Sequence, residues 1–331
     1  MTGSQHNSAE ADVERSCVSP AGYRCCLDDQ PDHLVPECFL KAWLHDQPNV
    51  GGMVLSPSCQ RTSGAEPEER HNREGPSQHG QELYLKYPGY NDALPFWIGP
   101  ELSATMDGLF SGRMHPLQLP EKTRDCLMLA GILVPARDTG RLHQAWLRTV
   151  ERCSQEFRNQ GYTPVSGLIH PFHVAALRRY YRRQIRTGAF KLGDSQSSRR
   201  YIAHNDPVAS FFHRLLAPAV SALTGKPVVP SYCYLASYQP GAILEKHLDR
   251  EQCEVSMTFC LDYSPEPRRE TAWPIYLHLG PRNIAVYQSL GDSLLYRGCQ
   301  IAHSRSRIPD GHTSTSLLFH YVRTNFVGAL N

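Results

Sequence analysis

Two residues that can bind a metal ion lie two positions apart in the segment ILEKHLDREQ, residues 243–252: His247 and Asp249. On an extended backbone, positions i and i+2 project to the same face, so both side chains can reach a single ion. A third ligand must come from another part of the chain. His303, in GCQIAHSRS, is the strongest candidate, because it follows a turn and strand, GDSLLYRG, at residues 291–298. That strand would place His303 inside a barrel.

Two neutral imidazoles and one carboxylate on one face of an octahedral ion leave the opposite face open for substrates. This arrangement is associated with non-heme Fe(II) oxygenases. A Zn²⁺ ion can use the same three ligands with a water molecule in the fourth position, so the ligand types alone do not decide the metal. The residues therefore predict a metal centre, and both oxidative and hydrolytic chemistry stay open.

A second His-x-Asp pair, His204 and Asp206, is interpreted differently. Asp206 precedes Pro207 and an apolar periodic run, which is the pattern of a helix N-cap followed by proline at the first helical position. The sequence therefore predicts the start of a helix here and no metal ligand. His320, in LLFHYV, is expected to be a core or barrel-wall histidine rather than a ligand.

The charge and cysteine content limit the classes of function. The 331 residues carry a formal net charge of +2, with 6 Lys/Arg against 12 Asp/Glu in residues 1–80 and 28 against 20 in the remainder. This basic surplus is too small for a nucleic-acid-binding surface, so no nucleic-acid partner is expected.

The 11 cysteines include no C-x-x-C pair, and the sequence shows neither an apolar signal segment nor a membrane-spanning apolar run. We therefore expect a reduced, cytoplasmic protein with free thiols and no membrane association.

The distribution of apolar residues predicts three parts. Residues 1–81 are acidic and rich in Ser, Pro and Gly, so we expect a mostly disordered extension, with a short docking helix at 33–44. Residues 82–160 predict a small, mainly helical module for recognition of a substrate or a partner. From residue 226 onward, short β-rich runs alternate with turns, a pattern typical of a sandwich or barrel of antiparallel strands. Residues 161–331 are therefore expected to form an α+β domain.

A predicted helix at residues 172–186 carries five arginines on the face opposite its apolar residues. One interpretation of this face is a solvated surface, and the other is a docking surface for an acidic partner. The five residues are Arg178, Arg179, Arg182, Arg183 and Arg186.

Residues 161–323 resemble an iron(II)- and 2-oxoglutarate-dependent oxygenase of the prolyl 4-hydroxylase-like branch. The matching features are YQPGAILEKHLD through the first two candidate ligands, then GDSLLYRG, and then the third candidate ligand with SLLFHYV after it. The resemblance implies a double-stranded β-helix, which is a jelly roll of antiparallel strands, with flanking helices. It also implies that Fe(II) is bound inside one end of this jelly roll by His247, Asp249 and His303.

The same resemblance implies the reaction. The co-substrates would be 2-oxoglutarate and O₂, and the products would include succinate and CO₂, with ascorbate as a candidate reductant. The substrate would be a small metabolite, an amino acid or a peptide, oxidised at an unactivated C–H bond. Related halogenases replace the carboxylate ligand by a small residue, so the presence of Asp249 favours hydroxylation. Two alternatives stay open: a non-catalytic jelly-roll binding or scaffold protein, and a zinc hydrolase on a cupin-like barrel.

Three residues are expected to hold the distal carboxylate of 2-oxoglutarate: Tyr238, Arg305 and Ser314. Tyr238 matches a tyrosine that prolyl-hydroxylase-like members place in this pocket. The family's usual Arg or Lys after the distal histidine is absent, because His312 and Ser314 occupy that region. If His303 points inward on its strand, Arg305 points inward too, since side chains alternate with a period of two. A guanidinium there can bind a carboxylate through two parallel hydrogen bonds.

Overall fold

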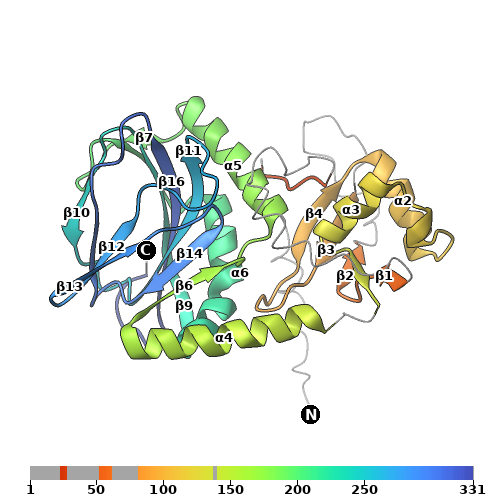
Figure 1. Ribbon diagram of the computed structural model, residues 1–331, viewed down its shortest axis with the longest axis horizontal. Coiled ribbons are helices and arrows are strands. Elements are labelled where there is room, and N and C mark those ends of the chain that lie inside the picture. Colours follow the sequence, from red (N-terminus) through yellow and green to blue (C-terminus); the bar gives the residue numbers. More distant parts are fainter. Residues whose placement is uncertain (1–22, 28–51, 62–80, 137–139, 331) are drawn as a thin grey trace, which may run out of the picture.

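The computed structural model describes residues 23–27, 52–61, 81–136 and 140–330. Figure 1 shows two units side by side, a larger one built around β-strands and a smaller one formed by the earlier residues. Within the described ranges, no helix has the length and apolar character needed to cross a membrane.

One wall of the larger unit is a seven-stranded sheet. Every neighbouring pair of its strands runs antiparallel. In spatial order, the strands are β6 (Tyr162–Ser166), β14 (Asp292–Tyr296), β11 (Val255–Ser264), β16 (Thr313–Arg323), β9 (Val228–Tyr238), β8 (Arg200–His204) and β7 (Lys191–Leu192).

A four-stranded sheet forms the opposite wall, and its neighbouring strands are also antiparallel. Residues of both sheets line one cavity, so the two sheets face each other across it. The prediction of antiparallel strands is confirmed. In spatial order, the strands of this sheet are β10 (Leu244–His247), β15 (Ala302–Arg305), β12 (Ile275–Leu279) and β13 (Arg282–Val286).

The two faces of the large sheet bury different residues. In β16, Leu317, Phe319 and Tyr321 belong to the main hydrophobic core, whereas Leu318 and His320 line the cavity. This alternation follows from the extended backbone, because successive side chains project to opposite faces. One face of the sheet therefore packs in the hydrophobic core, and the face that lines the cavity can carry polar and titratable groups.

Three helices pack on the face of the large sheet that is turned away from the cavity. They are α4 (Arg141–Gln160), α5 (Pro171–Arg186) and α6 (Pro207–Thr224). Helix α6 contacts β9 and β16, α4 contacts α6 and β6, and α5 contacts β11. The carboxylate of Asp206 accepts hydrogen bonds at 3.1 Å from the backbone N–H groups of Val208 and Ala209. The predicted helix start at Asp206 is thus confirmed.

The arginine-rich face of α5 is not uniformly solvated. Arg178 is completely buried, and its guanidinium donates hydrogen bonds to Asp262 at 2.8 and 3.0 Å and to Glu266 at 2.7 and 3.1 Å. Arg182 pairs with Asp262 as well, at 2.5 Å. Both interpretations of the face, as a solvated surface or as a dock for an acidic partner, are therefore wrong for Arg178. Its acidic partners belong to the same chain.

The smaller unit combines short strands and helices. Strands β2, β3 and β4 form one antiparallel sheet, and β1 pairs with β5. Its elements are β1 (Met53–Leu55), β2 (Cys59–Arg61), β3 (Gln81–Leu85), β4 (Leu94–Ile98), α2 (Pro100–Phe110), η4 (Pro116–Gln118), α3 (Glu121–Leu129) and β5 (Leu133–Pro135). Helix α4, the last element of the predicted module at residues 82–160, contacts α6 and β6 of the larger unit.

Two segments of the predicted disordered extension, residues 1–81, are packed into the structure. Residues 52–61 supply β1 and β2. Residues 23–27 lie alongside β4, where the N–H of Leu27 donates to the carbonyl of Trp97 at 2.9 Å. The prediction of disorder is wrong for these two segments, because pairing with strands distant in the sequence fixes their backbone.

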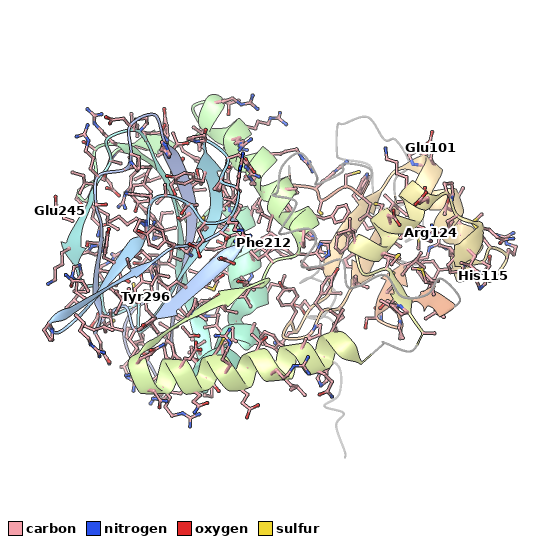
Figure 2. All side chains as sticks on the ribbon, in the orientation of Figure 1. Glu101, His115, Arg124, Phe212, Glu245 and Tyr296 are labelled. Carbon is pink, nitrogen blue, oxygen red and sulfur yellow. The ribbon has the colours of Figure 1, made fainter. Side chains whose placement is uncertain are left out.

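The segment 23–27 also contacts the larger unit. The side chains of Tyr23, Cys25 and Leu27 are no more than 3% exposed. The hydroxyl of Tyr23 lies 2.8 Å from Nδ1 of His173 in α5, and its ring meets that of Phe212 in α6 edge to face. Phe212, labelled in Figure 2, lies on the side of α6 that is near the smaller unit. Residues 23–27 therefore join the two units. The predicted docking helix at 33–44 lies outside the described residues.

Candidate metal centre

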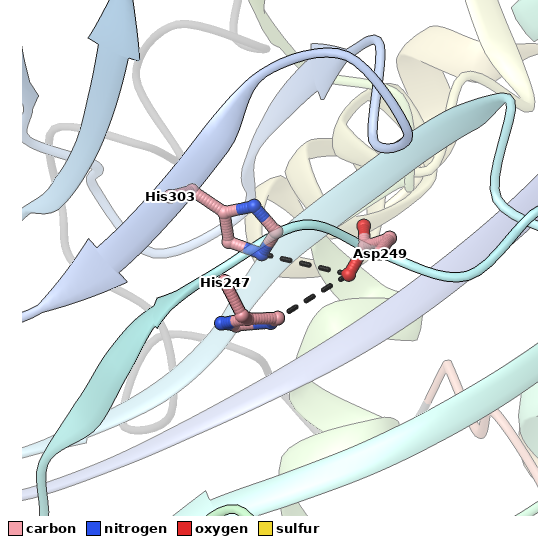
Figure 3. Close-up of side chains that lie close together, drawn as sticks. All are labelled: His247, Asp249 and His303. Carbon is pink, nitrogen blue, oxygen red and sulfur yellow. Dashed lines mark ion pairs between the residues drawn. The ribbon is translucent and has the colours of Figure 1, made fainter.

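The three predicted ligands come together where β10 and β15 pair. His247 in β10 and His303 in β15 are directly opposite each other in the antiparallel register. Asp249 follows two residues after His247, and its backbone N–H donates to the carbonyl of Gly298 at 3.1 Å. Oδ1 of Asp249 lies 3.7 Å from Nε2 of His247 and 3.6 Å from Nε2 of His303 (Figure 3). Three potential ligand atoms thus converge on one point.

Backbone carbonyls fix the tautomer of both histidines. Nδ1 of His247 lies 2.8 Å from the carbonyl oxygen of Glu245, and Nδ1 of His303 lies 3.3 Å from that of Ile301. Because a carbonyl oxygen only accepts, each Nδ1 carries the proton and each Nε2 keeps its lone pair. Burial lowers the pKa of His303 to about 4, so this imidazole is neutral near pH 7. Metal-binding histidines are commonly oriented by hydrogen bonds of this kind.

A buried hydroxyl orients the carboxylate of Asp249. Oγ of Ser256 donates to Oδ2 at 2.6 Å, which leaves Oδ1 turned toward the histidines. Nδ1 of His320 lies 3.0 Å from the same Oγ and must be the donor, since the hydroxyl proton is already used. Burial alone would raise the pKa of Asp249, but His303, His320 and the Ser256 hydrogen bond together hold this pKa below its ordinary value. The carboxylate is therefore ionised and fixed in orientation.

Gly298 makes this arrangement sterically feasible. A Cβ atom at this position would lie 2.3 Å from Oγ of Ser256 and 2.5 Å from Oδ2 of Asp249. Both distances are far shorter than van der Waals contact. The glycine that ends GDSLLYRG is thus required by the close approach of the aspartate and its supporting serine.

A cavity of about 390 Å³ opens beside the three ligands, between the two sheets. A volume of this size suits a small organic molecule. Arg305 in β15 lines the cavity together with His303, as the alternation of side chains along the strand predicts. The metal cluster and a guanidinium therefore share one enclosed space.

The guanidinium of Arg305 is buried without a compensating charge. It is 6% exposed and donates hydrogen bonds to the carbonyl of Trp273 at 2.8 Å and to Oε1 of Gln288 at 3.3 Å. Its cationic centre lies 4.7 Å from the centroid of the Trp273 ring. Among the residues that the structure describes, no carboxylate oxygen lies within 4.0 Å of this guanidinium. A buried cation of this kind is costly unless a ligand supplies the missing anion.

A second buried arginine at the cavity, Arg200 in β8, is already neutralised. Its guanidinium forms an ion pair with Asp194 and donates to Oε1 of Gln196 at 2.7 Å. It also donates to the hydroxyl of Tyr238 at 3.0 Å. The Tyr238 oxygen accepts that hydrogen bond, so its own proton is available to another acceptor. Of the two buried guanidiniums, Arg305 is thus the one suited to receive an anion.

A serine other than Ser314 lines this cavity. Ser314 is opposite Tyr238 in the pairing of β9 and β16, but it does not line the cavity, whereas Ser316 does. Oγ of Ser316 is buried and has no hydrogen-bond partner in the described part of the chain. His312 lies 2.8 Å, through Nδ1, from the hydroxyl of Tyr263. The predicted serine was thus one strand repeat away from the residue that faces the cavity.

Sequence reasoning missed several polar residues of the site. Ser256 and Ser316 lie in runs whose β-character was predicted, whereas the strand that carries Arg200 was not predicted. No local spacing marks the three residues as neighbours of the ligands. Tyr296 was also missed, although it belongs to the quoted GDSLLYRG segment. Tyr296 is the last residue of β14, and the alternation of side chains that identified Arg305 could also have placed Tyr296 on the cavity side of its strand.

No protein-family model and no curated protein matches the sequence. Comparison with solved structures gives a different result. Many of the structures similar to this one are 2OG-Fe(II) oxygenases. A prolyl-4-hydroxylase from Pseudomonas putida is 17% identical, and the alignment covers 53% of this chain and 100% of that chain with a TM-score of 0.44.

Two further similar structures are complexes with bound molecules. A prolyl hydroxylase from Trichoplax adhaerens, in complex with a hypoxia inducible factor peptide fragment, is 12% identical, with 54% of this chain and 91% of that chain covered and a TM-score of 0.46. HygX from Streptomyces hygroscopicus, with nickel, 2-oxoglutarate and hygromycin B bound, is 17% identical, with 52% and 86% covered and a TM-score of 0.41.

Proposed function

We propose that this chain is a non-heme Fe(II)/2-oxoglutarate-dependent dioxygenase whose core, within residues 161–331, is a double-stranded β-helix. The observation that carries the proposal is the cluster of His247, Asp249 and His303, with both Nε2 lone pairs and one carboxylate oxygen converging on a single point beside a cavity. Two imidazoles and one carboxylate with open positions suit Fe(II) in this class of enzyme.

The three side chains would hold Fe(II) through Nε2 of His247, Nε2 of His303 and Oδ1 of Asp249. Bound Fe(II), with 2-oxoglutarate and O₂, supplies the oxidation of a C–H bond, and succinate and CO₂ are released. The protein's own contribution is to hold the two imidazoles in one tautomer and to hold Asp249 through Ser256.

The distal carboxylate of 2-oxoglutarate would bind at the other end of the cavity. Arg305 offers an uncompensated positive charge and N–H donors that are not used by Trp273 or Gln288. Tyr238 offers its hydroxyl proton, because its oxygen already accepts from Arg200. Ser316 offers a buried hydroxyl without another partner among the described residues. A charged donor with two neutral donors would bind a carboxylate and exclude water from it.

We further propose hydroxylation of a small metabolite, an amino acid or a peptide as the reaction. The retained carboxylate ligand Asp249 supports hydroxylation, because halide would need that ligand position. The smaller unit, residues 52–61 and 81–136 with the segment 23–27, is the proposed element for recognising a substrate or a partner, since it lies beside the proposed catalytic unit in one chain (Figure 1).

The experiment that tests the function measures succinate formation from 2-oxoglutarate with Fe(II) and O₂. The wild-type protein should form succinate, and Asp249→Ala should not, because it lacks the anionic ligand. His204→Ala is the matched control, since this histidine stacks on Tyr232 and does not belong to the cluster. Absence of succinate in the wild type would favour the scaffold alternative. A hydrolytic activity that persists without O₂ and 2-oxoglutarate would favour zinc chemistry.

A further inference from the structure

Tyr296 is a buried tyrosine beside the metal cluster for which the proposed function has no role. It is the last residue of β14, is 3% exposed, and lines the cavity among the strands of the larger unit (Figure 2). Its hydroxyl oxygen lies 3.2 Å from Nε2 of His303, and the two rings meet edge to face with centroids 4.8 Å apart. The hydroxyl therefore contacts the nitrogen that faces Asp249.

The direction of this hydrogen bond follows from the tautomer of His303. Nδ1 carries the proton, because its neighbour is the carbonyl oxygen of Ile301, so Nε2 can only accept. The Tyr296 hydroxyl must then be the donor. It donates to the lone pair that a metal ion would need. A single lone pair cannot serve both, so metal binding at His303 must release the phenol proton from Nε2.

The released hydroxyl would remain beside the nitrogen that binds the metal. The Tyr296 oxygen is 3.2 Å from Nε2 without any movement. A buried donor that has lost its acceptor is unfavourable unless it finds another.

We propose that Tyr296 is a positioning residue that exchanges its hydrogen-bond acceptor when the metal binds. In the metal-free protein it donates to Nε2 of His303 and holds that ring in place. In the metal-bound protein it donates to an oxygen atom of 2-oxoglutarate on the open face. This inference rests on the proposed metal site and adds a residue to it.

Two effects of opposite sign follow for Tyr296→Phe. The variant has no hydrogen bond to give up at Nε2, so it should bind a divalent metal ion more tightly, by about fivefold. It also lacks the donor for the co-substrate, so the metal-loaded variant should bind 2-oxoglutarate more weakly, again by about fivefold. A purely structural role for the hydroxyl would weaken both steps, because loosened packing does not favour either ligand.

The experiment uses Co(II) as the probe, because it can be followed by visible absorption without turnover. Co(II) is titrated into the metal-free full-length protein, and 2-oxoglutarate is then titrated into the Co(II)-loaded protein. Tyr321→Phe is the matched control. It also removes a buried tyrosine hydroxyl, which donates to the carbonyl of His213 at 3.1 Å on the helix side of the sheet. The control should change neither dissociation constant, and thermal unfolding of both variants reports their stability.

Tighter Co(II) binding together with weaker 2-oxoglutarate binding in Tyr296→Phe supports the proposal. Any other combination in that variant overturns it, including an unchanged affinity for either ligand. If the wild-type protein binds Co(II) and 2-oxoglutarate but the variant matches it, only the role of Tyr296 is lost. If the wild-type protein does not bind Co(II) at all, the proposed metal site itself fails.

Discussion

Replacing Arg305 by glutamine should weaken the binding of 2-oxoglutarate at least tenfold. The guanidinium is 6% exposed and has only neutral partners, Trp273 and Gln288, among the described residues. A hydrogen bond to a charged group contributes about 1.5–3 kcal/mol, and glutamine keeps one neutral donor at best. The loss should therefore lie between about 1.4 and 3 kcal/mol, which corresponds to about 10- to 150-fold in Kd.

The assay is calorimetric titration of 2-oxoglutarate into the Fe(II)-loaded protein without O₂. Arg307→Gln is the control, because it makes the same change in charge two residues further on, at a side chain that is 63% exposed. An unchanged Kd in Arg305→Gln, or an equal loss in both variants, would refute the assignment of Arg305 as the carboxylate receptor.

The same titration separates the two serines. Ser316→Ala should weaken binding by about 1 kcal/mol, roughly fivefold, because its buried hydroxyl has no other partner among the described residues. Ser314→Ala should leave Kd unchanged, since Ser314 does not line the cavity. The reverse order would show that the co-substrate extends further along β16 than the cavity suggests.

Three predictions concern stability. Removing residues 1–27 should lower the free energy of unfolding by more than about 3 kcal/mol relative to removing residues 1–22, because it deletes three buried side chains; equal melting temperatures would contradict this. Burial lowers the pKa of His213 to about 3, so the unfolded state takes up the proton first. His213 alone should then contribute a fall in stability of between about 1 and 2 kcal/mol from pH 6.5 to 5, and His213→Gln should remove that contribution in urea titrations. Arg178→Ala should cost about 1.5–3 kcal/mol, because it removes the buried hydrogen bonds of the guanidinium to Asp262 and Glu266, whereas exposed Arg186→Ala should cost little.

The pair His247 and Asp249 could be predicted because its information is local, and the same holds for the side of the strand on which Arg305 lies. His247 and Asp249 are two residues apart on an extended segment, and the period of a strand then places Arg305 on the same side as His303. The predicted N-cap at Asp206 depends on the residues beside it in the same way. For each of these, neighbouring residues and a regular backbone are sufficient.

The errors arise where the partner is distant in the sequence. Arg178 looked solvated because its partner Asp262 is 84 residues away. Residues 23–27 looked disordered because a few apolar side chains in a polar context do not predict a core, and their strand partner near Trp97 forms only in the folded chain. Choosing Ser316 over Ser314 needed the length of the cavity along β16, which alternation alone does not give.

The contact between Tyr23 and His173 has a consequence for folding during synthesis. The two residues are 150 positions apart. At about 5–20 residues per second, a ribosome needs roughly 8–30 seconds to make the intervening chain. Throughout that interval, the buried face of Tyr23 has no partner in α5 or α6. Residues 23–27 are thus synthesised before α5 and α6, and they can pack against these helices only after both have emerged from the ribosome. Until then, this segment should be exposed to chaperones and proteases.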